Sequence, residues 1–220
     1  MQRLYRDTVF VVGVVALAWF VSAYGHSRNR LARTVDRNAW EEIDSSSGTS
    51  ELQSSGSVAV PKALAKAPIE MQRLAWLVGK WRSEESYGPG KLAPSSGIGD
   101  RTEEVKVGGE GLSLVADYGV RNPHGTFTGH EVIEYDRETG GYNISGSDKA
   151  SPSPWQWHLR GDWDSEALIF YGTAEREGRK LAMKLLYYDI GAKSFTMVLY
   201  LGEDPPHIEP VMTGQYSRAE

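Results

Sequence analysis

Two glutamates occupy positions where the chain alternates between polar and apolar residues. Glu85 follows Trp81 and Ser83 at two-residue spacing, and Glu131 precedes Ile133 at the same spacing. Side chains two residues apart in a strand lie on one face, so both carboxylates are predicted to face an apolar interior. A carboxylate in such surroundings has a raised pKa or a partner, and it can act as a ligand-binding group or a general acid or base.

Two simpler explanations of these glutamates stay open from the sequence. Either the assignment of strand faces is wrong by one residue, or an arginine such as Arg160 or Arg218 neutralises the carboxylate. An ion pair of that kind would be a structural feature and not a functional site.

The segment 155–160, WQWHLR, offers a second candidate site with two opposite faces. Trp155 and Trp157 share one face, whereas His158 and Arg160 share the other. An inward His158 and Arg160 would bind an anion or a carboxylate group. We favour the opposite orientation, in which the tryptophans form an apolar wall and the charges are solvated.

The other candidates are tyrosines on predicted interior faces, since an aromatic ring with one polar group suits a pocket wall. The predicted ligand-binding residues are Glu85, Tyr87, Glu131, Tyr135, Trp157 and Tyr187. No catalytic residue is assigned, because no triad or nucleophile motif accompanies the two glutamates. The chain has no cysteine, and its five histidines lack the helical i, i+4 spacing of a zinc motif, so no metal site is predicted.

The segment 74–87, LAWLVGKWRSEESY, marks the start of the elements that must position these side chains. Apolar residues recur at helical spacing over residues 69–78, which predicts a short amphipathic helix. Beyond Gly79 the spacing becomes alternating, which predicts a strand. Glycine easily takes the left-handed conformation that ends a helix, so the change of period at Gly79 has a physical cause.

Further strand-like runs follow at short and regular intervals, separated by turns rich in Gly, Asn, Asp and Pro. They are predicted at about 100–107, 111–119, 126–135, 141–148, 155–162, 166–174, 181–188, 194–201 and 209–218. The short connections leave no room for crossover helices, so the sheet is predicted to be antiparallel. The predicted fold class is all-β, with about ten strands in an up-and-down barrel, because closure removes exposed strand edges. A two-sheet sandwich is the alternative.

A helix leading into Gly79-Lys80-Trp81 and then a meander of strands resembles the lipocalins of the calycin superfamily. That resemblance implies a calycin-like barrel whose end is closed by Trp81, with Arg218 packed over the ring. The chain also resembles a family of uncharacterised bacterial lipocalin-like barrels, through Leu74-x-x-Leu77-x-Gly79-x-Trp81, Gly108-Gly109, Phe127-x-Gly129, Tyr135-Asp136 and Gly141-Tyr142. That family implies a fold and no activity, and Glu134 stands where a glycine would be expected.

Nitrobindin-type barrels are a more distant resemblance, and they hold haem through a histidine in the final strand. The predicted final strand of this chain, residues 209–218, contains no histidine, and His207 precedes it. The resemblance therefore does not extend to haem, and no cofactor is predicted.

The N-terminal region differs in character from the predicted barrel. Arg3 and Arg6 precede an uncharged apolar run at 8–25, which is typical of a signal peptide or a transmembrane anchor. Residues 26–67 read as a polar segment and a flexible linker rich in Ser, Gly, Ala and Pro, and 68–220 as the barrel domain. We therefore expect a barrel outside the cytoplasmic membrane, either anchored in it with a periplasmic or extracellular domain or secreted after cleavage.

Charge and composition limit the class of function. The 220 residues carry a formal net charge of -5, and six arginines with only two aspartates in residues 1–40 leave the remainder acidic. An acidic domain lacks the basic surface of a nucleic-acid binder. The leading hypothesis is a barrel that binds a small, apolar molecule. The alternatives are an enzyme with Glu85 or Glu131 as acid/base, and a closed envelope protein that serves as an interaction module.

Overall fold

The computed structural model of the protein describes residues 59–88, 96–123, 125–150 and 153–219. These residues belong to the second of two compact units of the chain, Met1–Gly48 and Thr49–Glu220. The predicted signal or anchor at 1–25, and the predicted polar segment and linker up to residue 58, lie outside the described residues. Within the described ranges, no helix has the length and apolar character needed to cross a membrane.

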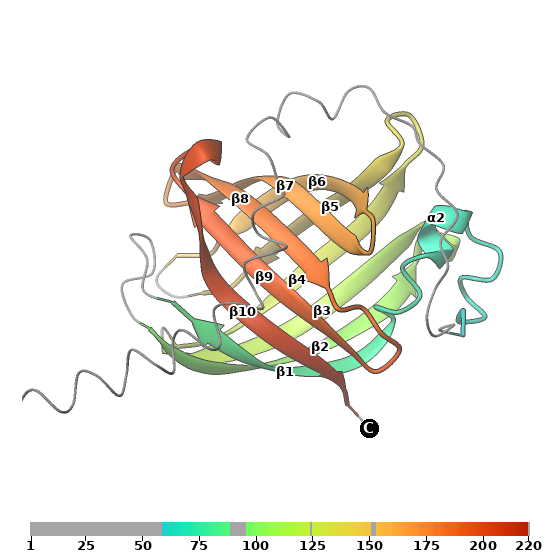
Figure 1. The fold of residues 1–220 in the computed structure, drawn as a ribbon, viewed down its shortest axis with the longest axis horizontal. Helices are drawn as coiled ribbons and strands as arrows, with labels where there is room; N and C mark the ends of the chain where they lie inside the picture. Colours follow the sequence, from blue (N-terminus) through green and yellow to red (C-terminus); the bar gives the residue numbers. More distant parts are fainter. Residues whose placement is uncertain (1–58, 89–95, 124, 151–152, 220) are drawn as a thin grey trace, which may run out of the picture. The chain divides into compact units, whose positions relative to one another are not determined.

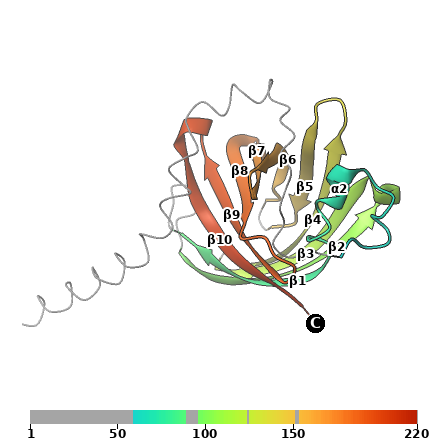
Figure 2. The same ribbon diagram turned by 45° about the vertical axis from the view of Figure 1, so that its right-hand side comes forward.

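Ten antiparallel strands form one closed barrel, as the sequence predicts, and Figures 1 and 2 show β1 beside β10. Each strand pairs with the next along the chain, and β1 also pairs with β10. The alternative of a two-sheet sandwich is therefore wrong. The strands are β1 (Gly79–Tyr87), β2 (Gly97–Gly108), β3 (Ser113–Asn122), β4 (Gly125–Asp136), β5 (Gly141–Asp148), β6 (Gln156–Asp164), β7 (Ala167–Arg176), β8 (Arg179–Tyr188), β9 (Ser194–Gly202) and β10 (Ile208–Arg218).

Tight turns connect several of the strands and explain why neighbours in sequence pair in space. The β7–β8 turn consists of Glu177 and Gly178, with φ angles of 54° and 72°. Two successive positive φ angles are typical of the turn whose twist matches that of a hairpin. Two short 3₁₀ turns, at Gly109–Gly111 and Pro205–His207, connect β2 to β3 and β9 to β10.

The predicted helix over residues 69–78 is only partly right, because the α-helix α2 covers Ile69–Gln72 alone. The chain then continues in turns, in which the N–H of Leu74 donates to Met71 O and that of Leu77 to Leu74 O. These hydrogen bonds join residues i and i+3, as in a 3₁₀-helix, and other carbonyl groups of the segment stay available to other donors. Arg218 donates to two of them, Trp76 O at 2.9 Å and Val78 O. These carbonyl groups therefore accept hydrogen bonds from the end of β10 and not from further helical turns.

The segment around α2 covers one end of the barrel, where β4 ends and β5 begins (Figures 1 and 2). The hydroxyl of Tyr142 on β5 donates to Glu70 O at 2.8 Å and fixes the helix to the barrel. Trp76 of this segment and Trp81 at the start of β1 pack edge-on against Phe195, with ring centroids 5.1 and 4.7 Å away. This end of the interior is therefore an apolar and aromatic core.

Candidate functional site

Glu85 lies inside the barrel with 1% of its surface exposed. The hydroxyls of Tyr87 and Tyr216 donate to its two carboxylate oxygens, and the distance from Tyr216 Oη to Glu85 Oε1 is 3.2 Å. Its partners across both neighbouring strands are glycines, Gly99 on β2 and Gly214 on β10. A Cβ at Gly214 would lie 3.3 Å from Glu85 Cγ, so these glycines provide the space that the carboxylate occupies.

Arg101 on β2 lies in the barrel wall with 12% of its side chain exposed, and it pairs with Glu103 on the same strand. Its Nε and Nη2 atoms lie 2.9 and 2.7 Å from Glu103 Oε2, and its guanidinium stands 3.8 Å from the centroid of the Tyr118 ring. Burial opposes the positive charge, but the carboxylates of Glu103 and Glu85 outweigh it and raise the pKa of Arg101. Arg101 is therefore a fixed cation inside the barrel, held by Glu103.

Glu131 on β4 is 7% exposed, and its partners on the neighbouring strands are the small residues Ala116 and Gly146. Burial and then the negative charge of Glu103 raise the pKa of Glu131 to about 7, whereas Arg101 and the Trp157 N–H act in the opposite direction. Glu131 therefore changes its charge near neutral pH.

We call Glu85, Arg101, Glu103 and Glu131 the interior charge cluster. Arg101 interacts electrostatically with all three glutamates, so the four groups form one connected set. Three acids share one base in this cluster. Asp148 is also buried, and it accepts hydrogen bonds from the backbone N–H groups of Ala150 and Trp155 at 3.1 and 2.9 Å, so it is satisfied locally.

Two buried polar atoms beside the cluster have no hydrogen-bond partner among the described residues. They are Ser83 Oγ, on the strand of Glu85, and Trp157 Nε1. The Trp157 N–H lies close enough to Glu131 to lower its pKa, yet it completes no hydrogen bond of ordinary geometry. A buried polar atom without a partner costs about 1–3 kcal/mol, so such atoms call for an explanation.

The remaining predicted site residues lie at the covered end of the barrel. Tyr187 is buried and packs edge-on against Trp76, with ring centroids 5.9 Å apart. Burial, with the charge of Glu131 as the next cause, raises the pKa of Tyr187 well above its usual range. Trp81 donates its indole N–H to Leu77 O at 2.6 Å, and Arg218 stands 4.3 Å from the Trp81 ring centroid. This is the contact that the lipocalin resemblance implies.

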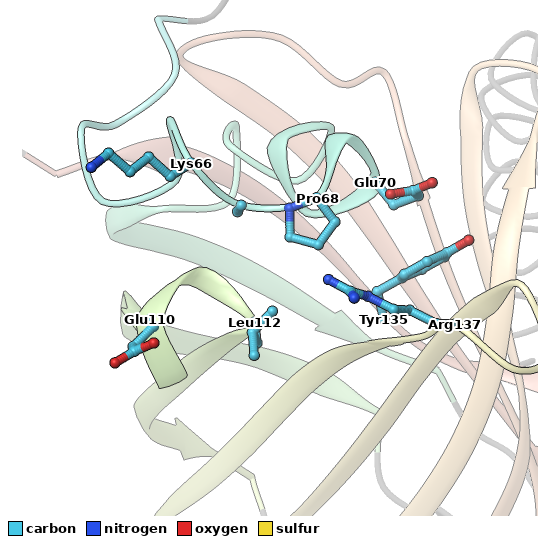
Figure 3. A pocket seen from close by; sticks show the side chains of 8 residues that line it. Lys66, Pro68, Glu70, Glu110, Leu112, Tyr135 and Arg137 are labelled. Atoms are coloured by element: carbon cyan, nitrogen blue, oxygen red, sulfur yellow. The ribbon is translucent and has the colours of Figure 1, made fainter.

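Tyr135 is separated from the interior charge cluster and lines a hollow of about 560 Å³ beside α2 (Figure 3). Burial and the charge of Glu70 raise its pKa. Two basic and two acidic residues line the hollow, and they are Lys66, Arg137, Glu70 and Glu110. Their formal charges cancel, so the hollow carries no excess of either sign.

The segment WQWHLR has the predicted orientation, with Trp157 toward the interior. Trp157 is buried in the interior, whereas His158 is exposed on the outer face. Arg160 donates to Thr139 O at 3.0 Å and does not reach either glutamate. Trp155 is half-buried beneath the guanidinium of Arg176, 5.4 Å from its ring centroid. An anion site built from His158 and Arg160 inside the barrel is therefore wrong.

The sequence-based prediction missed Arg101, Glu103, Tyr118 and Tyr216, which complete the site. Arg160 and Arg218, which the sequence offers as partners for a buried glutamate, both donate to backbone carbonyls instead. The useful signal was in β2, where Arg101 and Glu103 alternate in phase with Val105 and Val107. Two charges in phase with two valines point to a buried ion pair.

The comparison with solved structures supports the fold and does not extend to function. The barrel is similar to the crystal structure of Rv2717c from M. tuberculosis, with a TM-score of 0.53 and 10% identity over 74% of this chain and 100% of that chain. The S-type phycobiliprotein lyase CPES from Guillardia theta gives a TM-score of 0.48 and 9% identity, over 70% and 94% of the two chains. No protein-family model matches the sequence, and no curated protein matches it. The likeness to Rv2717c shows the barrel fold alone.

Proposed function

We propose that this protein binds a small molecule in the interior of its barrel, at the interior charge cluster. The observation that carries the proposal is the presence of two buried glutamates, a partly buried Arg101–Glu103 pair and several tyrosine hydroxyls inside a barrel whose other end is filled by apolar side chains. Barrels of eight or more strands are wide enough to enclose a small ligand.

The energetic cost of this cluster supports a functional role. Buried ion pairs contribute little to stability, and apolar side chains of similar size often replace them without loss. A barrel selected for stability alone would gain from apolar residues at Glu85 and Glu131. Polar groups that converge in an apolar interior are the usual means by which a binding site orients its ligand.

The same cluster refines the kind of ligand that was predicted from the sequence. A wholly apolar molecule would leave the carboxylates and Ser83 Oγ without new partners, at a cost in desolvation. We therefore propose an amphipathic ligand, whose apolar part contacts the aromatic side chains and whose polar group faces the cluster.

Native mass spectrometry of the full chain, purified from its own cells, tests this function. We expect a bound small molecule in the wild type and a clear reduction in its occupancy in Glu85→Gln, because this change removes the charge that Tyr87 and Tyr216 hold in place. Glu84→Gln is the matched control, since Glu84 is the exposed neighbour on the same strand. Wild-type protein without a bound small molecule would contradict the proposal. Equal occupancy of the molecule in Glu85→Gln and Glu84→Gln would contradict it as well.

The location and the family of the protein are further proposals that the sequence motivates. We propose that residues 8–25 direct the chain to the envelope, as an anchor or as a cleaved signal, and that the barrel belongs with the uncharacterised bacterial lipocalin-like barrels. Cell fractionation with intact-mass measurement tests the location. Recovery of the full-length chain in the cytoplasmic fraction would contradict it.

A further inference from the structure

We infer that the ligand of the barrel interior is an organic cation, with an ammonium group facing Glu85 and Glu131 and an apolar body against the aromatic side chains. The inference rests on the proposed function and names the class of molecule that the site would take. Four independent features of the interior support it.

The first feature is the shortage of positive charge. Arg101 is committed to Glu103 through two short contacts of 2.9 and 2.7 Å. Within the described part of the chain, no ion pair joins Glu85 or Glu131 to a basic side chain. A cationic ligand would supply the missing charge, whereas an anionic ligand would add a further negative charge.

The second feature is the aromatic character of the surroundings. The rings of Tyr87 and Tyr216 carry the hydroxyls that hold Glu85, and Phe195 stacks on Tyr216 with centroids 4.4 Å apart. Trp157 lies against Gly146, the strand partner of Glu131. Aromatic faces attract ammonium groups, and the attraction is strongest where water is excluded.

The third feature is Ser83 Oγ, which is buried without a hydrogen-bond partner among the described residues. The strand partners of Ser83 are Arg101 and Tyr216, so it lies among the groups of the cluster. A hydroxyl oxygen accepts a hydrogen bond from an ammonium N–H, as a carboxylate does. The cluster thus offers an acceptor beyond its acids.

The fourth feature argues for an organic cation over a metal ion. In the ranges that the structure describes, no three His, Asp or Glu side chains converge as metal ligands. Calcium and magnesium require six or more oxygen ligands around one point. One ammonium group needs only two or three acceptors, fewer than such a metal ion requires.

Binding of a cation is expected to be linked to the protonation of Glu131. The charged and titratable groups that influence or adjoin it come from five strands, and they are Arg101 and Glu103 on β2, Tyr118 on β3, His130 on β4, Asp148 on β5 and Tyr187 on β8. Because the ionised form of Glu131 attracts the ligand, affinity should rise as the pH rises through about 7.

A series of three probes with one phenylethyl body tests the inference by isothermal titration of the full chain. The probes are phenethylammonium, 2-phenylethanol and 3-phenylpropanoate. At pH 8 we expect the ammonium to bind roughly tenfold or more tightly than the alcohol, through ion pairing and contact with the aromatic rings. We expect the carboxylate to bind weakest, because like charges repel.

The pH dependence supplies a second readout that does not rely on the ranking. For the wild type, the ammonium should bind about tenfold more weakly at pH 6 than at pH 8, since Glu131 is largely protonated at pH 6. Glu131→Gln should abolish this dependence. Glu134→Gln, at an exposed position of the same strand, should retain it.

The outcomes separate this inference from the function on which it rests. Equal or tighter binding of the alcohol or the carboxylate, lost in Glu85→Gln, would overturn the cation and keep the interior site. Binding of the ammonium that is indifferent to Glu85→Gln and to pH would also overturn it. If none of the probes binds, the inference of a cationic ligand is wrong. The proposed binding function is then decided separately, by native mass spectrometry.

Discussion

Folding moves Glu131 from water into the barrel and raises its pKa from 4.5 to about 7. Between these values the unfolded chain has lost a proton that the folded chain keeps. The free energy of unfolding therefore falls as the pH rises through this window, and this contribution is constant above it. The size of the effect is about 3 kcal/mol for a shift of this order.

Glu131→Gln should remove this contribution, because the amide has no proton to lose. Denaturant unfolding of ligand-free protein at pH 5 and pH 8 checks the expectation. From pH 5 to pH 8, the free energy of unfolding of the variant should rise by roughly 3 kcal/mol relative to that of the wild type. Glu134→Gln should show no such change, and a constant offset for Glu131→Gln at both pH values would contradict the assignment.

The residues of the site show what strand alternation can and cannot predict. Alternation placed Glu85, Glu131 and Trp157 on the interior faces, because the side-chain period of a strand is two and tertiary context does not alter it. It did not identify Arg101 as the base among them. Pairing between side chains on different strands depends on register, which the chain specifies only through the completed barrel.

Among the elements, the segment before β1 shows that tertiary contacts can override the helical preference of a local sequence. The apolar spacing of residues 69–78 is helical, but the α-helix ends at Gln72. Arg218 donates to Trp76 O and Val78 O from the opposite end of the domain sequence, and helix propensity contributes less per residue than such bonds. The sequence could predict the glycine that follows, but not the arginine that replaces the helical bonds.

Gly79→Ala should destabilise the protein more than the same change at Gly178. Both residues have positive φ angles, 128° and 72°, so each substitution has a backbone cost. At Gly79 the new Cβ would also collide with the Arg218 guanidinium, whereas nothing lies within 4 Å at Gly178.

Chemical denaturation measures the two free energies of unfolding under one set of conditions. We expect losses of about 3 kcal/mol for Gly79→Ala and about 1 kcal/mol for Gly178→Ala. Equal losses would show that Arg218 moves aside without cost and that its contacts with the covering segment contribute little.

At the level of the whole barrel, nine of the ten strand pairings join consecutive strands, and only the pairing of β1 with β10 closes the ring. The Tyr216–Glu85 hydrogen bond across this closure joins residues 131 positions apart. Closing so long a loop has a larger entropic cost than forming a hairpin. We therefore expect the hairpins to form first and the closure, which completes the interior charge cluster, to form last.

This order predicts opposite kinetic effects for two variants in stopped-flow unfolding and refolding. Tyr216→Phe removes one donor to a buried carboxylate and should accelerate unfolding by about tenfold while leaving the folding rate nearly unchanged. Leu159→Ala removes a buried side chain from β6, which pairs only with β5 and β7, and should slow folding. If Tyr216→Phe slows folding as strongly as Leu159→Ala, closure is already present in the transition state. The interior cluster would then form together with the hairpins, and the barrel would acquire its binding site while it folds and not after it closes.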